Sequence, residues 1–171
     1  DMTQLFPSAS ELAEHAHVEP MFAAWQRGYG PIEHGPQACA AVYRMAHQLV
    51  QAGLQADLAS VYRDFHALDR LTAAGLWLVV HMTYAQRVRL DGVALVAEDF
   101  KVTPEGHTGG ALNMVPAYAG YLALNNLTGE TRGWLMGQGH CVAAIEALNL
   151  LTANQHPEQA KRYPCDEAGM S

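Results

Sequence analysis

The chain has 171 residues, a formal net charge of −7 and no block of basic residues, and half of its residues are hydrophobic. A chain of this length suits one domain with one core, and its acidic charge repels phosphodiester backbones, so we expect no nucleic-acid partner. Only 16% of the residues are charged, which is typical of a chain that covers part of its surface with another chain or domain.

The cysteines and the first residues indicate the compartment. Cys39, Cys141 and Cys165 are odd in number and lack C-x-x-C spacing, which argues against a disulfide framework and against a cysteine zinc site. Residues 1–10 have neither the basic nor the apolar region of a secretory leader. We therefore expect a cytoplasmic protein with no membrane partner. Position 1 is not Met, so we expect the chain to begin inside a longer polypeptide.

Two short helices are expected at the start of the chain, over residues 11–16 and 19–27, and Gly28 should end the second. His15 and His17 form an H-x-H pair of the kind that binds metal from a strand. On a helix these two side chains diverge by about 200°. We therefore interpret them as solvated surface histidines.

Two amphipathic helices should follow, without chemistry of their own. The first begins at Gly35-Pro36 and ends near Ala52. Asp57 caps the second, and Asp69 lies off its apolar stripe. That stripe consists of Leu58, Val61, Phe65 and Leu68.

Residues 71–88 predict a separate helix that is apolar around its whole circumference and hence buried on most sides. Its apolar run is far shorter than the ~20 residues that a bilayer requires. His81 within it is expected to be a hydrogen-bonded core histidine. Residues 88–95 then carry an Asp91-Gly92 turn between short alternating runs, which predicts a hairpin.

The first motif of chemical interest is Glu105-Gly106-His107-Thr108-Gly109-Gly110. Asn113 is a suitable cap for a helix over residues 114–125, with Pro116 in its first turn. Residues 106–110 should therefore form a flexible loop that leads into a helix N-terminus.

The second motif is Met136-Gly137-Gln138-Gly139-His140. Residues 131–136 are the best strand candidate, and a helix should run from His140 to about residue 153. Strand, glycine loop and helix form an anion-binding arrangement, because free N–H groups and the helix dipole favour a phosphate. Val142 stands where the dinucleotide fingerprint requires a small residue, which argues against a nicotinamide site.

Each histidine of the two motifs has a structural and a functional interpretation. A Gly-His pair can be a tight turn in which the imidazole hydrogen-bonds the backbone. Two such pairs, both before helices that can converge, suit an anionic site where imidazoles transfer protons. A Cys141–His140 nucleophile is conceivable, but adjacent helical residues point about 100° apart, so Cys141 is interpreted as a small buried residue.

The two motifs resemble those of a known family. Gly106-His107-Thr108-Gly109, followed by Leu112-Asn113 and Ala117-Tyr118, resembles the "G-H-x-G … L-N … A" stretch of phosphoketolases. Gln138-Gly139-His140 resembles their later "G-P-G-H-G" loop, and transketolases have a weaker version of both motifs. The resemblance covers roughly residues 71–151.

This resemblance implies the N-terminal segment of an enzyme that uses thiamine diphosphate and Mg²⁺ to cleave ketose phosphates such as xylulose 5-phosphate or fructose 6-phosphate. It implies a mostly α segment of a larger α/β, transketolase-like fold, with a helical arm over residues 1–70 and the start of the cofactor domain over residues 71–171. The residues matching the family's site fall into three groups: catalytic His107 and His140; cofactor-binding Gly137, Gln138, Gly139 and His140; and substrate-binding His107, Thr108 and Asn113.

The chain also departs from the family pattern. Cys141-Val142-Ala143 replaces the family's Gly-Gly-Pro, so a transketolase-like or epimerase-like reaction stays open. The Gly-Asp-Gly motif that holds the magnesium diphosphate is absent, as is the activating glutamate, so we expect no metal ligands here and expect catalysis to need the rest of a longer chain and a homodimer. The alternative is a non-catalytic helical module that binds an anionic metabolite or a partner protein.

Overall fold

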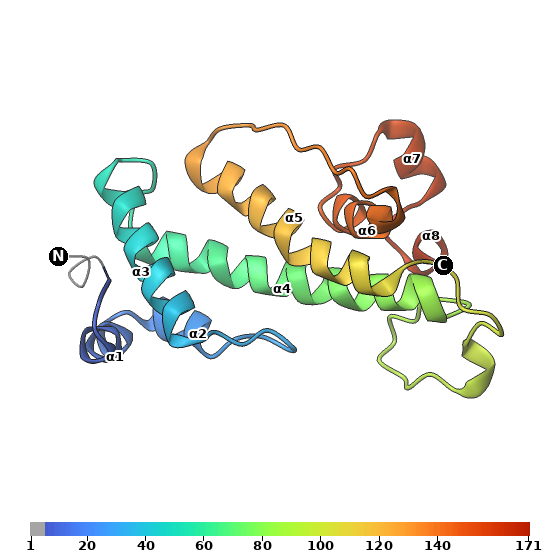
Figure 1. The fold of residues 1–171 in the computed structure, drawn as a ribbon, viewed down its shortest axis with the longest axis horizontal. Helices are drawn as coiled ribbons and strands as arrows, with labels where there is room; N and C mark the ends of the chain where they lie inside the picture. Colours follow the sequence, from blue (N-terminus) through green and yellow to red (C-terminus); the bar gives the residue numbers. More distant parts are fainter. Residues whose placement is uncertain (1–5) are drawn as a thin grey trace. The chain divides into compact units, whose positions relative to one another are not determined.

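The computed structural model describes residues 6–171 and is mostly helical (Figure 1). Within those residues there is no β-strand, and the only β-type pairings are the isolated bridges Tyr29–Ile32 and Ala85–Phe100. The predicted mostly α character of this segment is confirmed. No helix in the described part of the chain is both long and apolar enough to cross a membrane.

The chain divides into two compact units. Unit 1 comprises Asp1–Ala73 and Tyr121–Gly133, and unit 2 comprises Ala74–Gly120 and Trp134–Ser171. Two long helices, α4 (Leu58–Tyr84) and α5 (Thr108–Thr128), contribute residues to both units.

Unit 1 contains α1 (Ala9–Val18), α2 (Pro20–Gln26) and α3 (Pro36–Gln51), which appear in blue tones in Figure 1. Their termini follow from local chemistry: Ser8 and Glu11 form a reciprocal capping box at α1, and proline occupies the first position of α2 and α3. The core of unit 1 is centred on aromatic side chains. Its buried members are Leu12, Phe22, Trp25, Cys39, Ala40, Val42, Ala46, Leu49, Val61, Tyr62 and Leu127.

His15 is not the solvated residue that the sequence predicted, whereas His17 is exposed as expected. The His15 ring lies half-buried among aromatic rings, and its Nε2 is 2.8 Å from the Tyr62 hydroxyl. Burial, followed by the neighbouring His47, lowers the pKa of His15. The prediction failed because the helix turns His15 toward the α3 and α4 side chains.

Helix α4 is one continuous helix, where the sequence predicted two. Asp57 caps it as expected, with the Ser60 N–H 2.7 Å from its Oδ1. No glycine or proline stands between residues 58 and 74 to end the first part, so the helical hydrogen bonds continue. The helix is also less buried than predicted, since Trp77 and Val80 remain exposed while Leu78 and Val79 are buried.

Unit 2 packs three helices closely at a glycine. Gly75 of α4 faces α5 and α6 (Val142–Leu151), and a Cβ there would lie 2.9 Å from Leu148 and 3.0 Å from Val115. Glycine at this position therefore sets the close approach of the helices. The remaining elements of unit 2 are short: η2 (Ala97–Asp99), η3 (Gly139–Cys141), α7 (Pro157–Arg162) and α8 (Glu167–Met170).

The predicted hairpin over residues 88–95 is wrong. The Leu90 N–H donates to the Glu167 carboxylate at 2.6 Å, and the Val93 N–H donates to the Asp91 side chain at 3.0 Å. The carboxylates thus accept hydrogen bonds from backbone N–H groups that a hairpin would use to pair its two strands. The segment is therefore an irregular strap, which we call the 86–96 strap.

The predicted strand over residues 131–136 is also absent. Arg132 is held at one end by the Thr128 hydroxyl at 2.9 Å, and at the other end Trp134 packs on Tyr118 with ring centroids 4.6 Å apart. Side chains thus fix an extended segment that has no neighbouring strand within residues 6–171.

Candidate functional site

The loop of the first motif is attached to the C-terminal end of α4. The Glu105 N–H donates to the Thr83 carbonyl at 3.2 Å, and the Thr108 hydroxyl is 3.4 Å from the Tyr84 hydroxyl. Gly106 between them has φ +105°, which side-chain-bearing residues rarely adopt. The loop is therefore shaped by specific contacts and turns at Gly106.

His107 caps helix α5. Its carbonyl accepts from the Ala111 N–H at 3.2 Å, and its Nδ1 accepts from the Gly110 N–H at 3.1 Å. An imidazole nitrogen that accepts a hydrogen bond carries no proton, so neutral His107 has its proton on Nε2. The ring is exposed, which leaves the Nε2–H free to donate to a bound molecule.

Asn113 does not cap this helix, contrary to the prediction. Helix α5 begins at Thr108, because His107 supplies the cap six residues before Asn113, and this places Asn113 on the exposed side of the helix interior. Pro116 likewise lies in the helix interior and not in its first turn. Thr108 stays next to the loop, at the first helical position.

The second motif forms the short 3₁₀ turn η3 ahead of α6. The Cys141 N–H donates to the Gln138 carbonyl at 2.9 Å, which tightens the chain so that His140 is exposed and Cys141 is buried. Nothing lies within 4 Å of the positions where Gly137 and Gly139 would carry a Cβ. The loop thus offers open space and an accessible backbone.

The two motifs meet in unit 2. The rings of His107 and His140 lie edge to face, with centroids 4.5 Å apart. Gly110 makes this approach possible, because a Cβ there would be 2.6 Å from the Cys141 Sγ and 2.9 Å from the His107 Nδ1. The structure therefore brings together the two histidines that the sequence singled out.

Cys141 occupies the inner side of this arrangement. Its thiol is buried behind Gly110, as the sequence predicted for a small packing residue. A nucleophilic cysteine needs access to substrate as well as a neighbouring base. The two exposed histidines, and not Cys141, are accordingly the groups that a bound molecule reaches.

A cofactor diphosphate fits the residues of the second loop in part. The space where Gly137 and Gly139 lack a Cβ is large enough for the backbone to approach an anion closely. Within residues 6–171 no three His, Cys, Asp or Glu side chains are grouped so that they could hold a metal ion. Among the described residues, the second loop thus offers an accessible backbone at both glycines, without a neighbouring group of three candidate metal ligands.

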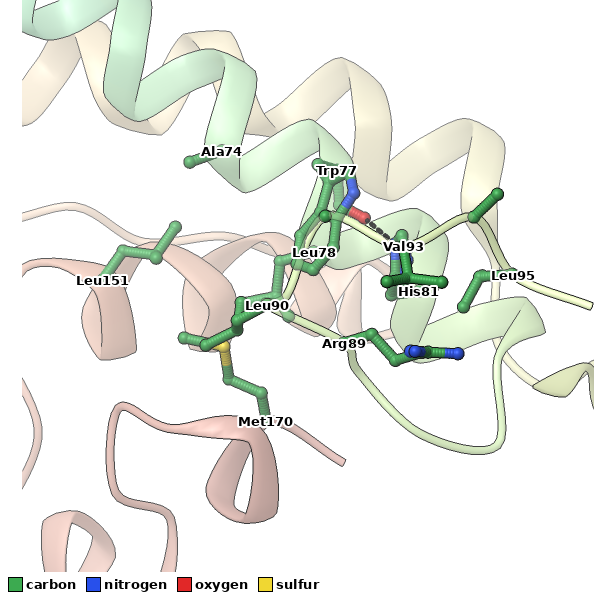
Figure 2. A pocket seen from close by; sticks show the side chains of 12 residues that line it. Ala74, Trp77, Leu78, His81, Arg89, Leu90, Val93, Leu95, Leu151 and Met170 are labelled. Carbon is green, nitrogen blue, oxygen red and sulfur yellow. Dashed lines mark hydrogen bonds between the residues drawn. The ribbon is translucent and has the colours of Figure 1, made fainter.

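A separate hollow of about 570 Å³ lies in unit 2 between α4 and the 86–96 strap (Figure 2). Trp77 and His81 form one wall with ring centroids 3.8 Å apart, and the His81 Nδ1 is 2.9 Å from the Trp77 carbonyl. His81 is hydrogen-bonded as predicted but is not in the core. Arg89 at the strap is paired with Asp91 at 2.7 Å, so its charge is already balanced. None of the predicted site residues line this hollow.

Sequence reasoning missed a buried pair in unit 1. The His34 Nε2 is 2.7 Å from the Asp69 Oδ2, and both side chains are nearly inaccessible. Asp69 was placed off the apolar stripe of its helix, and His34 was not considered. An acidic residue beside an apolar stripe, together with a histidine directly before Gly35-Pro36, is the only signal in the sequence.

Comparisons with known proteins leave the family open. No family model, curated protein or solved structure matches the chain.

Proposed function

We propose that the chain forms one wall of the active site of a thiamine-diphosphate-dependent enzyme that cleaves or rearranges ketose phosphates, as phosphoketolases do. The observation that carries this proposal is the approach of His107 and His140, two exposed imidazoles from separate glycine loops. Such a pair suits proton transfer to and from the oxygens of a sugar near neutral pH. The xylulose and fructose phosphates remain equal candidates for the substrate.

The two histidines have different roles in this proposal. His107 is fixed by the Gly110 N–H and presents Nε2–H, so it donates a hydrogen bond to a substrate carbonyl or hydroxyl oxygen. The ring of His140 makes no hydrogen bond to any other residue in the described part of the chain, so either nitrogen is free to carry a proton. His140 therefore accepts and returns the proton that moves during the reaction.

Thiamine diphosphate, when bound, supplies the nucleophilic carbon that makes the bond beside a ketose carbonyl cleavable. Residues 137–140 would contact its diphosphate through their accessible backbone, and Thr108 and Asn113 would lie on the substrate side. The Mg²⁺ ligands and the activating glutamate would come from the rest of a longer polypeptide and from a second copy in a homodimer.

The test uses the full-length polypeptide with thiamine diphosphate, Mg²⁺ and either ketose phosphate, and it measures the aldose phosphate that is two carbons shorter. Inorganic phosphate and an aldose phosphate are supplied in turn as acceptors to distinguish a phosphoketolase from a transketolase. Conversion to an isomeric ketose phosphate would point to the epimerase-like alternative. Absence of any conversion would contradict the enzyme proposal.

His107→Asn separates structure from chemistry at this site. Asparagine is among the best N-cap residues, so it retains the cap on α5 while removing the Nε2–H. We expect unchanged thermal unfolding and a kcat reduced by about 100-fold or more, the usual loss when one preorganised hydrogen-bond donor to a reacting oxygen is removed. The matched control is His156→Asn, because His156 also caps a helix through Nδ1, 3.4 Å from the Glu158 N–H, but lies at α7. Equal activity of the two variants would remove His107 from the site.

A further inference from the structure

The His34–Asp69 pair of unit 1 is held rigidly. His34 precedes α3 and Asp69 lies on α4, and their 2.7 Å contact joins side chains that are only 11% and 6% exposed. Trp25 of α2 stacks on the His34 ring, with centroids 4.1 Å apart and planes 26° from parallel. The imidazole is thus fixed by a hydrogen bond at one edge and by an indole on one face.

His34 lies at the wall of an apolar groove of about 840 Å³. Helix α1 contributes Leu12 to the groove, α3 contributes Ala40, and Phe6 lies beside them. This volume is within the range of small-molecule sites, which are mostly apolar and contain a few placed polar groups. No Lys or Arg side chain is found among the described residues that line it, and Arg44 lies over the ring of Phe6, so the lining itself offers an anionic ligand no charge partner.

One ring nitrogen of His34 remains available. Its Nε2 contacts Asp69. No residue within 6–171 hydrogen-bonds its Nδ1, and this nitrogen is also not among the fully buried polar atoms that lack a hydrogen-bond partner. Nδ1 is therefore not fully buried, and the His34 side chain to which it belongs lines the groove. A hydroxyl group both donates and accepts hydrogen bonds, so it can pair with Nδ1 whether or not that nitrogen carries a proton.

Cys39 also lines the groove, which raises the question of a cysteine nucleophile. Its Sγ is directed at the His34 carbonyl, 3.9 Å away, and burial raises the pKa of its thiol. A thiol that is buried and protonated is a poor nucleophile. The groove is therefore suited to binding and not to covalent chemistry.

We propose that this groove binds an uncharged apolar molecule that carries one hydroxyl group, and that the hydroxyl pairs with Nδ1 of His34. The Asp69 carboxylate is a positioning group that fixes the imidazole. This site is separate from the His107–His140 site, and the proposal does not depend on the reaction proposed above.

The experiment compares 1-naphthol with 1-methylnaphthalene, two probes of the same shape of which only the first has a hydroxyl. Calorimetry on the full chain should give about tenfold tighter binding of 1-naphthol, the difference expected from one hydrogen bond. His34→Phe should abolish this preference. Asp69→Asn should retain it, because the asparagine oxygen still accepts from the His34 Nε2–H, and His156→Phe is the control in unit 2.

A second measurement needs no variant. In ¹⁵N spectra of the wild-type chain, the Nδ1 resonance of His34 should move on addition of 1-naphthol and stay in place with 1-methylnaphthalene. Equal affinities for the two probes, or a preference that persists in His34→Phe, would overturn the proposal. Failure of both probes to bind would also overturn it, and a concentration-dependent dimer that excludes them would assign the groove to a second copy of the chain.

Discussion

The two units of the chain bury their hydrophobic residues to different degrees. Unit 1 encloses Phe22, Trp25 and Tyr62 almost completely, whereas the buried hydrophobic residues of unit 2 are, apart from Tyr118, aliphatic or small, and many of its larger apolar side chains are exposed. Val102 and Leu135 of unit 2 are 98% and 92% exposed. Exposed apolar surface is characteristic of a region that contacts another molecule. Unit 1 thus encloses an aromatic core, while unit 2, which carries the paired histidines, leaves more of its larger apolar side chains exposed.

The largest expected effect is a difference in the free energy of unfolding between truncating a buried leucine of unit 1 and truncating an exposed leucine of unit 2. Leu127 lies in the unit 1 core at 2% exposure, and Leu135 lies nearby in the sequence but in unit 2. We expect Leu127→Ala to lower the free energy of unfolding by about 2–5 kcal/mol, because it leaves a cavity, and Leu135→Ala to change it by less than about 0.5 kcal/mol. Chemical denaturation of both variants measures the difference, and similar losses would show that Leu135 is packed in solution.

A smaller effect is expected at the histidine pair. Gly110→Ala places a Cβ 2.6 Å from the Cys141 Sγ, so we expect a loss of about 1–3 kcal/mol from overpacking and a separation of the His107 and His140 rings. Gly109→Ala is the matched control, since nothing lies within 4 Å of its added Cβ and alanine favours the helix. Denaturation and histidine ring NOEs check both variants. Intact ring contacts in Gly110→Ala would contradict the account of this glycine.

The smallest expected effect is a local dependence on pH in the 86–96 strap. The Val96 N–H, followed by Arg87 and Arg89, lowers the pKa of Asp99, which is buried in η2 directly after the strap. A lowered pKa stabilises the folded form above the ordinary carboxyl value of about 3.9, and this stability is lost as pH falls through the folded pKa.

An NMR titration of the Val96 amide should therefore show a midpoint below about 3.9, and Asp99→Asn should show no such transition. A midpoint at or above the ordinary value would mean that these bonds do not hold Asp99 in solution.

The helices were largely predictable because local signals determine them. Pro36 begins α3 and Asp57 caps α4 as the sequence indicated, through chemistry confined to a few neighbouring residues. The two strand predictions failed for a non-local reason. Residues 88–95 are held by side chains such as Glu167, and residues 131–136 by Tyr118, contacts that alternation in the sequence does not encode.

The candidate site was predictable in its residues and not in its details. Glycines around His107 and His140 indicated two loops before helices, and the structure places the rings in contact. The His107 imidazole, and not Asn113, caps α5. The sequence did not indicate this, because histidine is not one of the usual capping residues. The buried Asp69 was missed because its partner, His34, lies 35 residues away.

The most direct test of the paired site is a double-mutant cycle in the full-length polypeptide, with His107→Asn and His140→Gln measured singly and together for ketose phosphate turnover. Residues that act on one substrate are coupled, so the double variant should lose much less than the sum of the single losses in activation free energy, with an interaction of about 1 kcal/mol or more. Losses that add within about 0.5 kcal/mol would show two independent residues and contradict a shared site.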